Sequence, residues 1–185
     1  MKKLLAISLS IVAMCFGAVA AWAQESAKEN VPNDALLRDV NTSQYVSEGS
    51  RAYLAKNYKH AIVFYNKALE QEMKAPTLEQ NVWRVVVDNL GYSYYSIGNN
   101  SKAKEVFEYG SAKDDKFPMF YYNLACLYAE MNDLDNALAK LTLAFKYKDN
   151  MISGERLPNP ATDSSFAGYL GNERFRRVLA ELTSR

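Results

Sequence analysis

A three-residue motif recurs along the chain and constrains its fold more than any other feature. In each copy an alanine is followed four residues later by an aromatic residue or leucine, and three residues after that by a small residue. The copies are Ala61, Tyr65 and Ala68; Ala103, Phe107 and Gly110; and Ala137, Leu141 and Ala144. Spacings of four and three residues place the members of a copy on one face of an α-helix. The chain therefore repeats one helical unit three times.

A second helix in each unit is indicated by small residues twelve positions before each leading alanine. These residues are Gly49, Gly91 and Ala125. Antiparallel helices cross closely only where side chains are small, and a bulky residue would force them apart. Each unit is therefore predicted to be a helical hairpin, and the spacing shows no strand-like alternation.

The turns between the paired helices carry their own signals. An Asn or Asp stands four positions before each leading alanine, where its side chain can accept hydrogen bonds from the free N–H groups of the next helix. These residues are Asn57, Asn99 and Asp133. They follow Lys56, Gly98 and Asn132, and glycine and asparagine tolerate the positive φ that reverses the chain.

This pattern resembles the tetratricopeptide-repeat (TPR) family over roughly residues 42–149, with its 34-residue helix–turn–helix unit. The resemblance implies an all-α fold with three repeats, at about 44–75, 77–115 and 117–149, in a short right-handed solenoid. Asn99 and Asp133 are 34 residues apart, whereas Asn57 and Asn99 are 42 apart. The eight extra residues fall near 70–80, where Thr77 and Gln80 predict a capping box and a long helix over 77–97.

The chain after the third repeat is predicted to cap the array. Gly154, Pro158 and Pro160 indicate a loop over 150–162. Residues 163–185 then predict two short helices, one capped by Asp163 and one by Asn172. The apolar residues of the two helices are Phe166 and Leu170, then Phe175, Val178, Leu179 and Leu182. The last repeat of a solenoid needs such a cover, although a partner-binding tail is an alternative, and the ending resembles that of many bacterial TPR arrays.

The N-terminus has the basic, apolar and small-residue order of a secretory signal peptide over residues 1–23, with cleavage expected after Ala23. A membrane anchor is the alternative. Cleavage removes two of the 22 basic side chains and none of the 21 acidic ones, which leaves a formal charge of −1. That balance argues against nucleic acid as a partner. We expect a periplasmic or secreted protein with a flexible arm over 24–43.

The sequence carries no recognisable catalytic or metal-binding motif. Phosphate-binding glycine loops, nucleophile elbows and zinc-protease motifs are missing from it. Cys126 and His60 are the only cysteine and histidine after residue 23, too few for a structural zinc site. We therefore expect no enzyme activity, no metal and no cofactor, and we expect Cys126 to be a packing residue.

The resemblance to TPR proteins implies a concave groove lined by the first helix of each repeat. It assigns a partner-binding role to Tyr53, Asp88, Asn89, Tyr92, Tyr95, Tyr122 and Asn123. Tyrosine suits binding because it offers a large contact area with a polar tip, but these tyrosines are also candidates for the core. The expected function is an adaptor that binds a protein or peptide non-covalently. The alternative is a structural or self-associating subunit of a cell-envelope complex.

Overall fold

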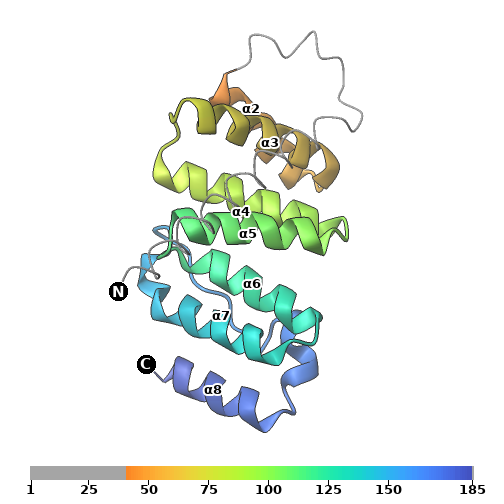
Figure 1. Cartoon of the computed structure of the whole chain (residues 1–185), viewed down its shortest axis with the longest axis vertical. Helices are drawn as coiled ribbons and strands as arrows, with labels where there is room; N and C mark the ends of the chain where they lie inside the picture. The colour runs from red at the N-terminus through yellow and green to blue at the C-terminus, as the bar shows by residue number, and fades with distance from the viewer. Residues whose placement is uncertain (1–40, 185) are drawn as a thin grey trace, which may run out of the picture. The chain divides into compact units, whose positions relative to one another are not determined.

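The computed structural model describes residues 41–184, so the predicted signal segment 1–23 and most of the predicted arm lie outside the described part. Helices make up this part, and no strand occurs in it, so the predicted all-α fold is confirmed. Figure 1 shows α2 beside α3 and α6 beside α7. The elements are α2 (Thr42–Leu54), α3 (Tyr58–Lys74), α4 (Gln80–Ser96), α5 (Asn100–Lys113), α6 (Pro118–Glu130), α7 (Leu134–Lys146), η2 (Lys148–Asn150), η3 (Ser164–Tyr169) and α8 (Glu173–Thr183).

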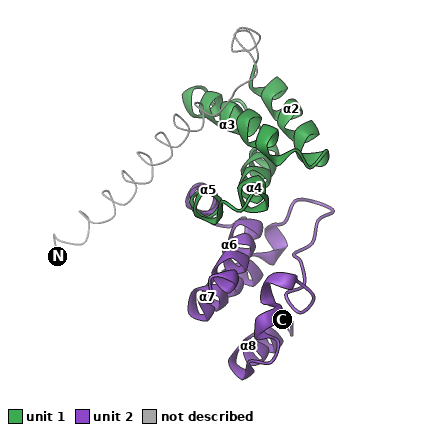
Figure 2. Ribbon diagram, turned by 90° about the vertical axis from the view of Figure 1, so that its right-hand side faces the viewer, with its two compact units in different colours: residues 1–105 green, residues 106–185 purple. Residues whose placement is uncertain are grey.

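The chain divides into two compact units, coloured separately in Figure 2. Unit 1 comprises residues 1–105 and unit 2 residues 106–185, so the boundary falls within α5. The described part of unit 1 begins with a capping box. The Asn41 side chain accepts from the Gln44 N–H, and the Gln44 side chain accepts from the Asn41 N–H. Helix α2 therefore begins at Thr42, two residues earlier than expected.

The three hairpin turns have the same geometry. Lys56, Gly98 and Asn132 all have positive φ, at 58°, 80° and 59°. The N–H of the following residue donates to the carbonyl five residues earlier, which closes each first helix in a Schellman motif. These bonds run from Asn57 to Ala52, from Asn99 to Tyr94 and from Asp133 to Tyr128, at 2.8, 2.9 and 2.9 Å. The predicted turn positions are confirmed, and Lys56 adopts positive φ without being glycine or asparagine.

The predicted Asn and Asp caps are also confirmed. Each side chain accepts a hydrogen bond from the N–H three residues later, at the start of the second helix. The N–H of His60 donates to Asn57 at 3.4 Å, that of Lys102 to Asn99 at 3.2 Å and that of Asn136 to Asp133 at 3.1 Å. One residue thus ends the first helix through its own N–H and begins the next through its side chain.

Glycine makes the close helix crossing possible in unit 1. A Cβ atom placed on Gly49 would lie 2.6 Å from Cδ1 of Tyr65, which is far inside van der Waals contact. The partner of Gly49 is therefore an aromatic ring, and not a second small residue. Within unit 2, Gly110 meets Phe120 in the same way, at 2.9 Å.

The extra residues between the first and second hairpins are placed differently from the prediction. Helix α4 begins at Gln80, so the capping box at Thr77 and a helix start at 77 are wrong. The backbone N–H and the hydroxyl of Thr77, with the N–H of Leu78, donate instead to the Glu72 carboxylate. The insertion lengthens α3 and α4 to 17 residues each, against 13 for α2, α6 and α7.

The C-terminal segment of unit 2 packs on the last hairpin. Phe166 of η3 and Phe175 of α8 are fully buried and stack with ring centroids 5.7 Å apart. Asp163 caps η3 and Asn172 caps α8, as predicted. Leu170 was predicted to belong to the buried face but is exposed, because η3 is a 3₁₀-helix with a different periodicity.

Replacing Lys56 by glycine should stabilise the protein. A non-glycine residue at positive φ is strained, so Lys56→Gly should raise the free energy of unfolding by about 1 kcal/mol. Urea denaturation measures this change. Lys67→Gly, in the middle of α3, is the matched control and should lower stability instead. Equal destabilisation by both substitutions would contradict the strain at Lys56.

Enlarging Gly49 should separate α2 from α3. Gly49→Ala places a methyl group against the Tyr65 ring and should cost about 2 kcal/mol of folding free energy. Ser47→Ala, at an exposed position of the same helix, controls for helix propensity. The cost of Gly49→Ala should fall in a Tyr65→Leu background, because the shorter leucine side chain leaves room for the new methyl group. Fully additive costs in this double-mutant cycle would show that the ring is not the obstacle.

Candidate protein-binding surface

Four tyrosines of unit 1 form one cluster, which we call the tyrosine cluster: Tyr53, Tyr58, Tyr92 and Tyr95. The rings of Tyr53, Tyr58 and Tyr92 contact one another edge to face, with centroids 5.9–6.0 Å apart in all three pairs. Tyr95 lies 5.9 Å from Tyr92. Such pairs contribute about 0.5–1.5 kcal/mol beyond area burial. The four rings therefore hold one another in fixed positions.

The turn geometry explains the cluster. Tyr53 lies near the end of α2 and Tyr58 is the first residue of α3, so the reversal at Lys56 returns the chain beside Tyr53. Tyr92 and Tyr95 are three residues apart and share one face of α4. Tyr58 was not among the predicted site residues. Its position directly after a predicted turn, five residues beyond Tyr53, was the available signal.

Two apolar side chains nearer the start of α4 are exposed as well, and Asp88 lies between them and Tyr92 along the helix. Tyr92 is 41% exposed, and Val82 and Val85 are 36% and 37% exposed. Val85 lies seven residues before Tyr92, so the two side chains share a face of the helix. We call the cluster together with these two valines the tyrosine face. It offers apolar area and phenolic hydroxyls on a rigid base, which suits protein recognition.

An acidic side chain lies beside the tyrosine cluster. The pKa of Tyr53 is raised, chiefly because its hydroxyl is removed from water, and then by the nearby Asp88 carboxylate. The neighbouring tyrosines raise the pKa further. A tyrosine is already protonated at neutral pH, and the raised pKa keeps the Tyr53 hydroxyl protonated under more alkaline conditions as well. Tyr53 and Asp88, both among the predicted site residues, thus lie close together in unit 1.

Asn89 takes part in a hydrogen-bond chain inside unit 1. Its Nδ2 donates to the Tyr65 hydroxyl at 3.1 Å, and Tyr65 donates to Ser50 Oγ at 3.2 Å. The chain links α4, α3 and α2. Asn89 therefore has a structural contact, while its role toward a peptide backbone stays a prediction.

The two predicted site residues of unit 2 are in a different setting. The Tyr122 side chain is only 2% exposed, its hydroxyl donates to Asp163 Oδ2 at 2.9 Å, and its ring meets Phe166 edge to face. Asn123 lies half-buried on the same helix. Tyr122 is thus a core residue in this structure, because the C-terminal segment covers it. Unit 1 holds the other five predicted residues, Tyr53, Asp88, Asn89, Tyr92 and Tyr95.

Cys126 has the environment of a packing residue. Burial raises the pKa of its thiol, and the Asp163 carboxylate, with Oδ2 3.9 Å from Sγ, raises it further. A thiolate is the reactive form of cysteine, so these surroundings suppress nucleophilic chemistry. His60 is exposed, with Nδ1 2.9 Å from Asn57 Oδ1. Within residues 41–184, no three His, Cys, Asp or Glu side chains are grouped so that they could bind a metal ion.

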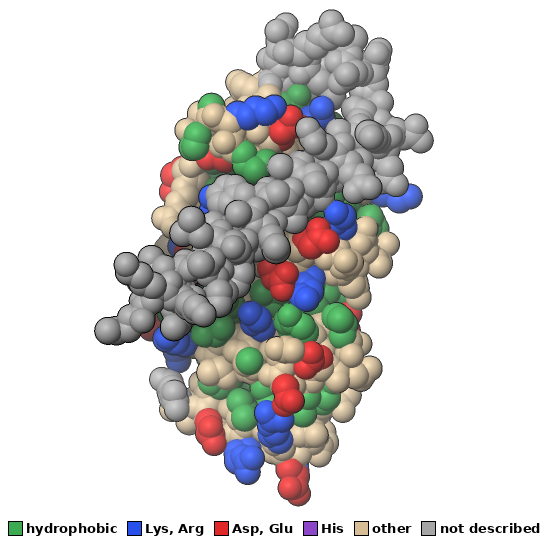
Figure 3. Space-filling model, in the orientation of Figure 1, with side chains coloured by type: hydrophobic (Ala, Val, Ile, Leu, Met, Phe, Trp, Pro, Cys, Tyr) green, Lys and Arg blue, Asp and Glu red, His purple; other side chains and the backbone are tan. Residues whose placement is uncertain are grey.

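Charge is mixed on the visible part of one face of the molecule (Figure 3). On the face shown in Figure 3, basic and acidic side chains lie interspersed. None of the helices in the described part is long and apolar enough to span a membrane.

Helical hairpins that repeat one turn geometry, with glycines where helices pack closely, define an all-α helical-repeat protein. A family model described as a tetratricopeptide repeat matches residues 120–150, which spans α6 and α7. The α6–α7 hairpin is therefore a tetratricopeptide repeat, and the described part of the chain has the fold of a tetratricopeptide-repeat array. A search of curated proteins gives no significant match.

The solved structures that resemble the chain include PcrH and a chain from the CopN–Scc3 complex. PcrH from Pseudomonas aeruginosa has a TM-score of 0.54 at 20% identity, with 80% of this chain and 98% of PcrH covered. A chain from a structure described as the CopN–Scc3 complex has a TM-score of 0.53 at 14% identity. That match covers 88% of this chain and 84% of the other. At these identities the likeness establishes the fold.

Truncation should destabilise the protein much less at an exposed tyrosine of α4 than at a buried one. Tyr92→Ala removes an exposed ring and should lower the free energy of unfolding by about 1 kcal/mol. Tyr94→Ala should cost about 3–5 kcal/mol, because Tyr94 is buried and its hydroxyl accepts from Asn66 Nδ2 at 3.0 Å. Chemical denaturation compares the two variants. Similar losses would place Tyr92 in the core and remove it from the candidate surface.

Proposed function

We propose that the chain is a non-enzymatic adaptor that binds a protein or peptide on the tyrosine face of unit 1. The observation that carries this proposal is Tyr92, an exposed aromatic ring held by three other tyrosines on a helix that also exposes Val82 and Val85. Aromatic anchors held in place before binding lose little entropy when a partner arrives. Binding by such a surface is non-covalent.

The composition of the tyrosine face supports a protein partner. It combines apolar area with phenolic hydroxyls and the carboxylate of Asp88, which matches the mixed apolar and polar character of protein interfaces. TPR arrays bind peptides or helices through such surfaces. One structural neighbour comes from a structure described as a complex, CopN–Scc3, which agrees with a role in protein association.

The proposal places this binding outside the cytoplasm. Residues 1–23 have the layout of a signal peptide, and the mature chain would begin at Gln24 with a formal charge of −1. An exported adaptor of this kind could act within an envelope complex.

Site-specific photo-cross-linking tests the adaptor proposal. We expect benzoylphenylalanine at position 92, in protein expressed in the source cells, to capture a partner of defined mass. Position 97 is the matched control, because Ile97 is also 41% exposed and ends the same helix. Adding Tyr53→Ala should abolish capture from position 92, since it removes a supporting ring. The intact mass of the purified protein reports whether residues 1–23 have been removed.

The other outcomes are equally informative. Capture from position 155, in the exposed loop of unit 2, with none from position 92, would support the structural-subunit alternative. Capture of a second copy of this chain would support self-association. Equal capture from positions 92 and 97 would show that the tyrosine face has no special role.

A further inference from the structure

A segment of the chain itself occupies the α6 surface in unit 2. We call residues 157–166 the strap. Pro160 and Phe166 are buried, and Leu157 packs at the edge of the core that α6 and α7 form. The surface it covers includes Tyr122 and Cys126, two residues of the first helix of the third repeat. In the TPR pattern this is the side on which a partner is expected.

The strap is held by contacts that resemble those of a bound peptide. The Asp163 carboxylate accepts from the Tyr122 hydroxyl at 2.9 Å and from the Ser165 N–H at 2.9 Å, and Cys126 Sγ lies 3.9 Å away. The Ser165 hydroxyl donates to Glu130 at 3.2 Å. The Phe166 ring meets Tyr122 edge to face and stacks on Phe175. One carboxylate and one aromatic ring three residues later therefore anchor the strap.

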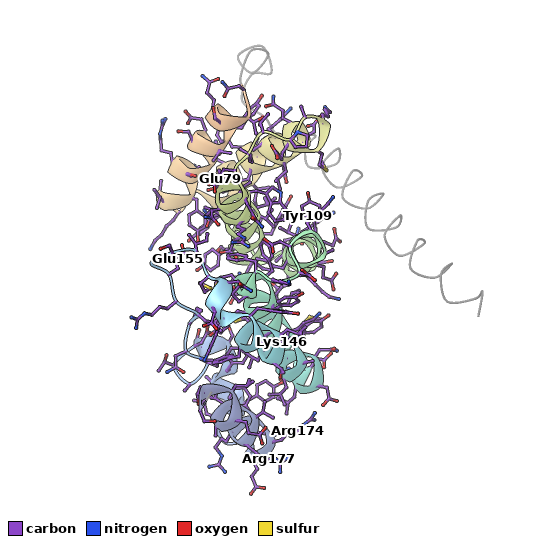
Figure 4. The ribbon with its side chains drawn as sticks, turned by 90° about the vertical axis from the view of Figure 1, so that its left-hand side faces the viewer. Glu79, Tyr109, Lys146, Glu155, Arg174 and Arg177 are labelled. Atoms are coloured by element: carbon purple, nitrogen blue, oxygen red, sulfur yellow. The ribbon has the colours of Figure 1, made fainter. Side chains whose placement is uncertain are left out.

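The loop that precedes the strap has the features of a segment that opens easily. Backbone hydrogen bonds in this region are local: Glu155 donates to Ile152 within the loop, and Thr162 donates to Asn159 within the strap itself. Gly154 has positive φ, and Glu155 lies on this loop in Figure 4. At its start, Asn150 Nδ2 donates to the Lys116 carbonyl at 3.2 Å. Segments with local hydrogen bonds and exposed backbone open at much lower free energy than the core.

We propose that the strap is an intrachain ligand of the α6 face, which opens by local unfolding of residues 151–166 while α6 and α7 stay folded. In the closed state the strap excludes partners from the α6 face. A partner then reaches that face only by displacing the strap, whereas the tyrosine face of unit 1 needs no such step. The proposal concerns unit 2 alone and does not rest on the proposed function.

Cys126 provides the reporter for strap opening. The chain has two cysteines, so Cys15→Ser leaves Cys126 as the sole thiol of the full chain. Its labelling rate with a thiol reagent is measured against urea concentration, beside the global unfolding curve. Local opening predicts labelling that depends only weakly on urea at low concentrations, where global unfolding is negligible.

Two variants weaken the strap. Asp163→Ala removes the anchoring carboxylate and should speed labelling about tenfold. Tyr122→Phe removes one hydroxyl and should speed it about fivefold, and it keeps the carboxylate near the thiol, so a change in intrinsic thiol reactivity cannot explain the result. Asn172→Ala is the matched control, because Asn172 caps α8 and does not belong to the strap. It should leave labelling at low urea unchanged.

Two results would overturn the proposal. Labelling that follows global unfolding in every variant would make the strap a fixed part of the core. Labelling of the wild-type chain at the rate of an unfolded thiol would show that the strap does not cover Cys126. Should Asp163→Ala fail to fold, Tyr122→Phe still decides between local and global opening, because it removes a single hydrogen bond.

Discussion

The helix reversal at Lys56, Gly98 and Asn132 is the constraint on which the hairpins depend. Positive φ at one residue turns the chain, and the Asn or Asp that follows satisfies groups of both helices. The second helix must then run back along the first, and in the first hairpin Gly49 lets the two approach. The tyrosine cluster is a product of this reversal, because Tyr58 is the first residue after the turn and meets Tyr53, which precedes it.

Local signals predicted the hairpins well because their causes lie within a few residues of one another. The turn residue, the cap and the leading alanine are all within five positions, so each can be identified in the sequence alone. The insertion was harder to predict. Thr77 and Gln80 have the spacing of a capping box, yet the Glu72 carboxylate takes the donors of Thr77 and Leu78, and α4 starts at Gln80. Whether Glu72 can reach these N–H groups depends on where α3 ends, which the spacing of Thr77 and Gln80 does not reveal.

The exposure of a candidate site residue could be predicted only where all of its neighbours lie close to it in the sequence. Tyr92 and Cys126 occupy the same position in successive repeats, 34 residues apart. Tyr92 is exposed, whereas Cys126 lies under Asp163, which comes 37 residues later in the chain. Tyr122 is buried for the same reason. Repeat periodicity assigns a residue to a face of a helix, but a distant segment decides whether that face is open.

The tyrosines of unit 1 have two roles. The buried tyrosines hold together the helices on which the exposed tyrosines lie. Tyr65 connects Ser50 to Asn89, and Tyr94 accepts from Asn66, so buried hydroxyls link α2, α3 and α4. Buried polar contacts have strict geometry, because an unpaired group in the core is costly. They therefore fix how these three helices cross. The relative positions of Tyr53, Tyr58 and Tyr92 follow from that crossing, which is why a surface assembled from three helices can be rigid before a partner binds.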